Sequence, residues 1–160
     1  MIDRSRLIYL HGLESTSQSG KARQFAQKFP GMLTPDFKGS FEARMQQLGP
    51  ILGTNTGWTI IGSSFGGLMA AVFAGLHLLQ VRKLILLAPA LMLPEFAAGH
   101  FTAIDIPTVL VHGRQDEVVP PDPIREIAQA IFTRLEYIAV DDDHRLQKAF
   151  AELDWDQILA

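Results

Sequence analysis

A serine flanked by glycines is the feature of this sequence that most directly suggests chemistry. Ser64 lies in the segment Gly-Ser-Ser-Phe-Gly at residues 62–66, after an apolar run at residues 58–61 and before a helical pattern at residues 65–79. A serine at a sharp strand-to-helix turn takes up a strained backbone conformation that exposes its hydroxyl, and small neighbours avoid collisions there. We therefore predict that Ser64 is a nucleophile.

An acid and a base for this serine follow in the sequence. Asp116 lies in a loop at residues 112–120, and His144 lies in an acidic loop at residues 141–145. Of the five histidines, only His144 follows Asp116. In a Ser-His-Asp triad the imidazole takes the serine proton, and the carboxylate fixes the imidazole tautomer. Because each of the three residues comes just after an apolar run, we predict that Ser64, Asp116 and His144 form such a triad.

Two alternatives concern the acidic residues of these loops. Glu117 is the nearest rival to Asp116 as the acid, and both could instead be solvated turn residues. The aspartates at residues 141–143 could raise the proton affinity of His144 or cap the helix that follows. We favour the capping interpretation for these three aspartates.

The loop after the first apolar run offers a site for a developing negative charge. It begins His11-Gly12-Leu13, and a glycine lets the backbone turn an amide toward a neighbouring site. We predict that the backbone N–H of Leu13 and that of Phe65, the residue after the nucleophile, form an oxyanion hole. The alternative for the first loop is a plain turn.

Short apolar runs alternate with helical patterns along the chain, which is typical of βα units on a mostly parallel sheet. The strands are continuously apolar, so both faces of the sheet should be covered. The pattern predicts an α/β fold, a three-layer α/β/α sandwich with about six strands. We place the strands at residues 7–10, 32–35, 58–62, 83–88, 108–112 and 135–140, and the helices at residues 19–29, 41–52, 65–79, 121–131 and 145–159.

The composition is that of an ordinary globular domain. The chain has 160 residues, 48% of them hydrophobic, a net charge of −3 and no cysteine. Residues 1–160 are therefore expected to form a single domain without a substantial lid domain. The mild acidity disfavours nucleic-acid and membrane partners. The absence of cysteine excludes disulfides and fits a cytoplasmic location, and the apolar stretch at residues 84–93 is too short to cross a bilayer.

The chain resembles the α/β-hydrolase family, most closely its small, lidless YqiA-type esterases. The resemblance rests on residues 8–12, 17–22, 62–67, 112–120 and 143–144, and it spans nearly the whole chain. It implies a minimal α/β-hydrolase fold that lacks the usual first two antiparallel strands, so that residues 7–10 would form an interior strand. It also implies Ser64 as nucleophile, His144 as base, Asp116 as acid, and the Leu13 and Phe65 amides as oxyanion donors.

The connection at residues 89–107 is short where the family usually carries a lid. Met92 and Phe96 in this connection, with Glu14 on the other side, could line a substrate pocket, although Met and Phe at such spacing could equally be core. We expect hydrolysis of small carboxylic esters through an acyl-enzyme, with no cofactor and no metal. The alternatives are a thioesterase that uses the same residues and a catalytically silent binding module of the same fold.

Overall fold

A single parallel sheet forms the centre of the protein. The structure, a computed structural model, describes residues 1–160. The strands are β1 (Leu7–Leu10), β2 (Trp58–Ser63), β3 (Val81–Leu87), β4 (Thr108–Gly113) and β5 (Leu135–Val140). They lie in the order β1-β2-β3-β4-β5, and every neighbouring pair is parallel. The continuous apolar runs form these strands because both faces of the sheet are covered, as expected for a parallel sheet.

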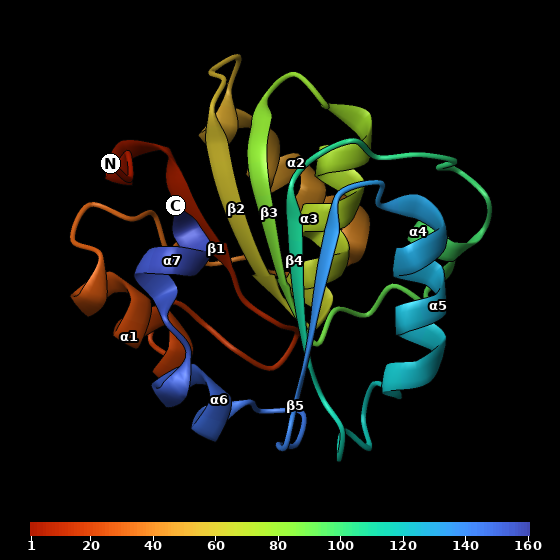
Figure 1. The fold of residues 1–160 in the computed structure, drawn as a ribbon. Helices are drawn as coiled ribbons and strands as arrows, with labels where there is room; N and C mark the ends of the chain where they lie inside the picture. The colour runs from red at the N-terminus through yellow and green to blue at the C-terminus, as the bar shows by residue number, and fades with distance from the viewer.

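Helices cover the two faces in separate layers (Figure 1). On one face, α2 (Phe41–Leu52), α3 (Phe65–Leu76), α4 (Pro94–Ala97) and α5 (Pro121–Ile131) contribute to an apolar cluster of 27 buried residues. On the other face, α1 (Gly20–Lys28), α6 (Gln147–Glu152) and α7 (Trp155–Leu159) contribute to a cluster of 17 buried residues. A short 3₁₀ helix, Arg4–Arg6, precedes β1. This arrangement confirms the predicted three-layer α/β/α sandwich.

The sheet has five strands rather than the expected six. Residues 32–35 do not form a strand, because only Leu33 pairs with the sheet, through an isolated bridge to Ile8. Leu33 N–H donates to Leu7 O, and Leu33 O accepts from Tyr9 N–H, both at 2.9 Å. Pro35 has no N–H with which to continue this pairing. As a consequence β1 is an edge strand, and the expectation that it lies inside the sheet was wrong.

The C-terminal helical region consists of two short helices, whereas one helix at residues 145–159 was expected. The chain is extended at Leu153, which separates α6 from α7. The Asp154 side chain then caps α7 by accepting a hydrogen bond from Gln157 N–H at 3.1 Å. Trp155 turns back onto α6 and donates its indole N–H to Phe150 O at 2.8 Å. The break therefore lets both helices bury their apolar residues against the same face of the sheet.

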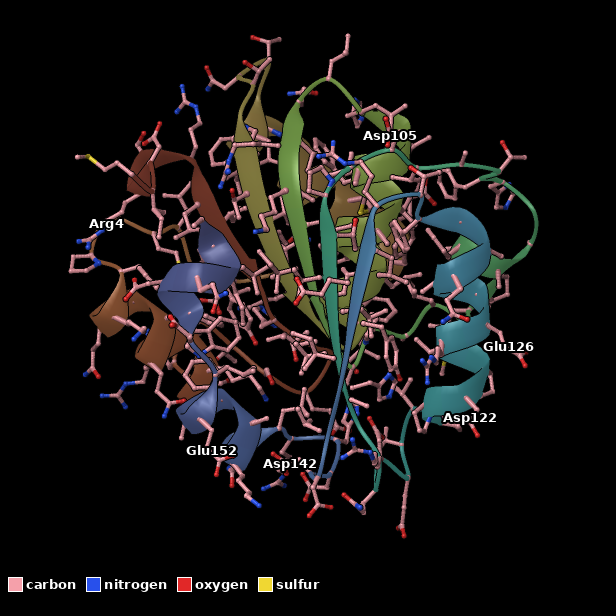
Figure 2. All side chains as sticks on the ribbon, in the orientation of Figure 1. Arg4, Asp105, Asp122, Glu126, Asp142 and Glu152 are labelled. Atoms are coloured by element: carbon pink, nitrogen blue, oxygen red, sulfur yellow. The ribbon has the colours of Figure 1, made fainter.

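The carboxyl ends of all five strands lie on the same side of the sheet, here called its carboxyl edge, which is distinct from the outer strands β1 and β5. Figure 2 shows Asp142, just after β5, at this edge, and Asp105, which precedes β4, at the opposite edge. Because the strands are parallel, the loops that carry the predicted site residues meet at the carboxyl edge. None of the helices combines the length and the apolar character needed to cross a bilayer.

Candidate active site

Ser64 occupies a strained turn between β2 and α3. Its backbone has φ 55° and ψ −113°, a conformation that non-glycine residues rarely adopt, and it is the N-cap residue of α3. Such a conformation costs about 1–3 kcal/mol and persists only where the surroundings enforce it. Here Ser64 N–H donates to Leu87 O at 2.9 Å, and Ser64 O accepts from Ala90 N–H at 3.0 Å. The turn is therefore held by β3 and by the segment that follows β3.

The glycines around Ser64 are required by close backbone contacts. A Cβ atom at Gly62 would overlap the carbonyl oxygen of Gly66, and one at Gly66 would overlap the carbonyl oxygen of Leu10. A Cβ at Gly67 would lie 2.7 Å from Pro89 Cβ. These contacts bring the start of α3 against β1, β2 and the segment after β3, so the glycine spacing seen in the sequence serves packing at this turn.

The structure brings together the three side chains that were predicted to form a triad. His144 Nε2 lies 3.1 Å from Ser64 Oγ, and His144 Nδ1 lies 2.8 Å from Asp116 Oδ2. An ionised carboxylate can only accept a hydrogen bond, so Nδ1 carries the proton and Nε2 is free to accept one from the Ser64 hydroxyl. The His144 side chain is 22% exposed, whereas the Asp116 side chain is fully buried. The arrangement can therefore remove a proton from Ser64 at an accessible position.

Backbone amides of its own loop hold the Asp116 carboxylate in place. Asp116 Oδ1 accepts from Val118 N–H at 2.9 Å and from Val119 N–H at 2.8 Å. Asp116 Oδ2, which faces His144, also lies 3.2 Å from His112 Nε2. The rival acid Glu117 is exposed to solvent. Of the two candidate acids, Asp116 is therefore the one that the structure brings to His144.

The loop that carries His144 is anchored by its aspartates. Asp142 Oδ2 accepts from Ala149 N–H at 2.9 Å, in the first turn of α6, and Asp143 Oδ1 accepts from Arg145 N–H at 3.0 Å. Asp142 therefore binds the first turn of α6, in the manner of a cap, but the N-cap residue of α6 is Leu146, and Asp143 accepts only within its own loop. The loop also joins the loop of Asp116, because Asp142 O accepts from Gln115 N–H at 3.0 Å.

The two amides predicted to bind an oxyanion lie on segments that flank Ser64. Phe65 is the first residue of α3, so its N–H has no acceptor within the helix. Gly12, which precedes Leu13, lies against the nucleophile, because a Cβ built there would be 3.6 Å from Ser64 Cβ. The buried His11 ring holds this loop: Nδ1 contacts Gly12 O at 2.7 Å, and Nε2 accepts from Phe37 N–H at 2.9 Å.

The three residues predicted to line a substrate pocket have different surroundings. Glu14 is exposed, and Met92, in the segment after β3, is 40% exposed. Phe96 is fully buried and stacks on Phe101 and Phe132, with ring centroids 5.3 and 5.8 Å apart. The assignment of Phe96 to the pocket is therefore wrong, because its ring belongs to the core beneath α4.

Two residues beside the site were missed at the level of the sequence. His112 was interpreted only as the end of a strand, although it stands four residues before Asp116 and its ring contacts that carboxylate. The Arg44 guanidinium of α2 lies over the Phe65 ring, 5.4 Å from its centroid. The spacing of His112 and Asp116 was a usable signal, whereas nothing in the sequence relates Arg44 to Phe65. No group of three or more His, Cys, Asp or Glu side chains is placed to hold a metal ion.

Solved structures with the same fold define the class of the protein. An α/β serine hydrolase homologue from Coxiella burnetii superposes with a TM-score of 0.77 at 20% identity, covering 99% of this chain and 85% of that chain. A protein assigned to the α/β-hydrolase superfamily from Xanthomonas campestris pv. campestris gives 0.72 at 27% identity, with 91% and 90% covered. The monoacylglycerol lipase of Paleococcus ferrophilus gives 0.75 at 13% identity, with 96% and 93% covered.

The fold is therefore that of the α/β-hydrolase superfamily. Within it, residues 6–105 match the uncharacterised protein family UPF0227, and the chain belongs to that family. This result confirms the resemblance to the YqiA-like branch that the sequence suggested. A comparison with curated protein sequences gave no match.

Proposed function

We propose that the protein is a serine hydrolase that cleaves small carboxylic esters through Ser64, His144 and Asp116. The observation that carries this proposal is the unbroken series of contacts from Ser64 Oγ to His144 Nε2 and from His144 Nδ1 to Asp116 Oδ2. The strained backbone at Ser64 adds support, because strain of this kind is typical of functional positions. Membership of a superfamily of hydrolases supports a hydrolytic reaction.

The reaction proceeds in two acyl transfers. In the first, Ser64 Oγ attacks the ester carbonyl while His144 Nε2 takes the hydroxyl proton, and the same nitrogen then returns this proton to the leaving alcohol. In the second, His144 removes a proton from water, the resulting hydroxide attacks the acyl-enzyme, and Ser64 Oγ leaves with the proton. Asp116 accepts the Nδ1 hydrogen bond throughout and stabilises the imidazolium. These steps use only groups of the chain and water.

The Leu13 and Phe65 amides are proposed to hold the oxyanion of each tetrahedral intermediate. The free N–H at the first residue of α3 and the position of Gly12 against Ser64 support this role. Two amides that are fixed before the reaction stabilise the developing charge, and each is typically worth a factor of about 10² to 10³ in rate.

We propose an open site on a single α/β-hydrolase domain, residues 1–160, that has no lid domain. The segment from the end of β3 to the start of β4 contains only the short helix α4 between its turns. Glu14 and Met92 stay as proposed contacts at the mouth of this site, on the loops that follow β1 and β3. Small esters suit such a site better than long lipid chains that must be enclosed.

Two other functions share parts of this arrangement. A thioesterase would use the same nucleophile and base, so the choice between ester and thioester belongs to the substrate test. A silent binding module would have no physical need for a serine that is held in a strained turn and hydrogen-bonded to a histidine. The contacts at Ser64 therefore favour an enzyme over a binding module.

Labelling with a fluorophosphonate probe tests the proposal directly. We expect covalent labelling of Ser64, loss of labelling in Ser64→Ala, and retained labelling in Ser63→Ala, which removes the neighbouring serine as a control. A panel of aryl esters and thioesters from acetyl to dodecanoyl then assigns the bond and the acyl length. Folded wild-type protein that is neither labelled nor active on the panel would overturn the proposal in favour of a binding module.

A further inference from the structure

His112 is a fully buried titratable side chain that the proposed reaction does not use. It lies in β4, and its Nε2 atom is 2.8 Å from Val119 O and 3.2 Å from Asp116 Oδ2. Both side chains of the His112–Asp116 pair have no exposure to solvent. The two contacts link the end of β4 to the far side of the loop that carries the acid.

The surroundings determine the protonation state of this ring. A carbonyl and a carboxylate oxygen are both acceptors, so His112 Nε2 carries a hydrogen, which it donates to Val119 O, and Asp116 Oδ2 is a second, longer contact. His112 Nδ1 is buried and has no hydrogen-bond partner. Burial lowers the pKa of His112. Of the neighbouring titratable groups, Asp116 raises this pKa and His144 lowers it. The ring is therefore neutral, with one N–H directed at Asp116 and Val119.

The contact with His112 completes the hydrogen bonding of the Asp116 carboxylate. Oδ1 accepts from the amides of Val118 and Val119, and Oδ2 accepts from His144 Nδ1 and lies within reach of His112 Nε2–H. Three hydrogen bonds and the contact with His112 therefore surround the two oxygens and restrict the rotation of the carboxylate. They also disperse its negative charge, which would otherwise be concentrated on the contact with His144.

We propose that His112 is a positioning residue. Its contact with Asp116 Oδ2 fixes the orientation of the carboxylate and weakens the attraction between this carboxylate and the protonated His144 ring. His112 acts through Asp116 and touches neither substrate nor nucleophile. The inference rests on the proposed function, because it assigns His112 a part in the same proton transfer. The competing explanation is that His112 only fills space and ties down the loop through Val119 O.

Three variants separate these explanations. His112→Leu keeps most of the volume and removes the donor. His112→Gln restores a side-chain N–H near the position of Nε2. Leu110→Ala is the matched control, because Leu110 is fully buried two residues away on the same strand and its side chain has no hydrogen-bond donor. Urea unfolding measures the stability of each variant, and the variants are compared under conditions in which all of them are folded.

The readouts are kcat, KM and the pH profile of kcat/KM. We expect His112→Leu to lower kcat about tenfold or more, well short of the roughly 10⁴-fold loss that follows when the histidine tautomer is wrong altogether. KM should change little. The acid limb of the profile should move to higher pH, because the carboxylate with one donor fewer holds the protonated His144 more tightly. His112→Gln should recover most of kcat and the original limb, and Leu110→Ala should leave the limb in place.

The proposal is overturned if folded His112→Leu keeps the wild-type kcat and acid limb, or if Leu110→Ala moves the limb equally. A second measurement does not depend on activity. Ring ¹⁵N shifts of His144, assigned by comparison with His144→Gln, follow the protonation of this ring with pH, and we expect their midpoint to move to higher pH in His112→Leu, in line with the acid limb. An unchanged midpoint in His112→Leu would also overturn the inference, whereas an inactive wild type with the expected shift of the midpoint would count against the proposed function alone.

Discussion

His144 Nδ1 lies 2.8 Å from Asp116 Oδ2, although the two residues belong to loops that follow different strands. These strands, β4 and β5, are neighbours in the sheet, and their parallel pairing brings both loops to the same edge. Two backbone amides hold the carboxylate through its other oxygen, independently of the imidazole. Its direction is therefore set by the fold and does not depend on His144.

Asp116→Asn should keep the fold and lose turnover. An asparagine oxygen can still accept from the Val118 and Val119 amides, so the loop should hold its shape. The NH₂ group would instead face His144 and favour the wrong tautomer, which costs roughly 10⁴-fold in kcat for a triad of this kind. Steady-state kinetics on the preferred ester, with circular dichroism to check folding, measures both effects.

Glu117→Gln is the control for that variant. Glu117 is exposed, so its change should leave kcat near the wild-type value. A large loss in Glu117→Gln together with an active Asp116→Asn would move the acid's role to Glu117.

Gly66→Ala should be severely destabilising. The new Cβ would overlap the backbone carbonyl of Leu10, so α3 would have to move away from β1. Strain of this kind in a packed interior costs about 3 kcal/mol or more. Gly20→Ala is the opposite case, because Gly20 begins α1 with open space around it, so alanine should fit there without loss of stability. Chemical denaturation of both variants measures this contrast, and equal stabilities would contradict the packing at the turn.

Tyr9 should make the folded protein sensitive to alkaline pH. Burial raises the pKa of Tyr9 to about 12 from its ordinary value of 10.0. The unfolded chain therefore loses this proton first, so the stabilisation is complete below about pH 10 and is lost as the pH rises to about 12. Two pKa units correspond to at most about 3 kcal/mol. Unfolding free energies measured against pH should fall over this range in the wild type and fall less steeply in Tyr9→Phe.

Tyr137 provides the comparison for that measurement, since it is the other tyrosine of the chain. Burial raises the pKa of Tyr137 as well, but this side chain is only partly buried and lies beneath the Arg125 guanidinium. Tyr137→Phe should therefore change the alkaline slope less than Tyr9→Phe. The reverse ranking would show that Tyr9 is not the buried phenol responsible.

Phe25→Ala should weaken the layer of α1, α6 and α7. The Phe25 ring is fully buried and lies within about 5 Å of the rings of Phe150 and Trp155, with centroid distances of 4.8 and 5.0 Å. Loss of a buried phenylalanine ring costs about 3–5 kcal/mol. Gln24→Ala, at an exposed neighbouring position, should leave the midpoint of urea unfolding nearly unchanged. Similar midpoints for both variants would contradict the packing of this layer.

The strands of the sheet could be predicted because they are short, mostly apolar runs that are bounded by turns. The predicted strand at residues 135–140 and the helices at residues 41–52 and 121–131 have the bounds found in the structure. The third helix ends at Leu76, before the expected residue 79, since His77 is its C-cap. The site residues could be placed on their loops for the same reason, since a loop after a parallel strand always reaches the carboxyl edge.

The errors arise where particular contacts, rather than the hydrophobic pattern, decide the structure. Residues 32–35 have the composition of a strand, but a strand also needs a continuous row of amides, and Pro35 interrupts it. Residues 145–159 fit a helical period, but the cap at Asp154 and the contact of Trp155 with Phe150 favour a break. Phe96 could not be assigned to core or pocket from spacing alone, because its burial depends on the rings of Phe101, in the same connection, and of Phe132, at the end of α5.

The strand β5 is the least buried of the five strands and pairs with β4 alone. It leads directly into the loop that carries His144, whereas Ser64 follows the fully buried β2. Elements at an exposed margin open at a lower free energy than the centre of a fold. On warming, we therefore expect β5 and the loop of His144 to open while Ser64 is still held by the folded centre of the sheet. Thermal inactivation should then precede global unfolding.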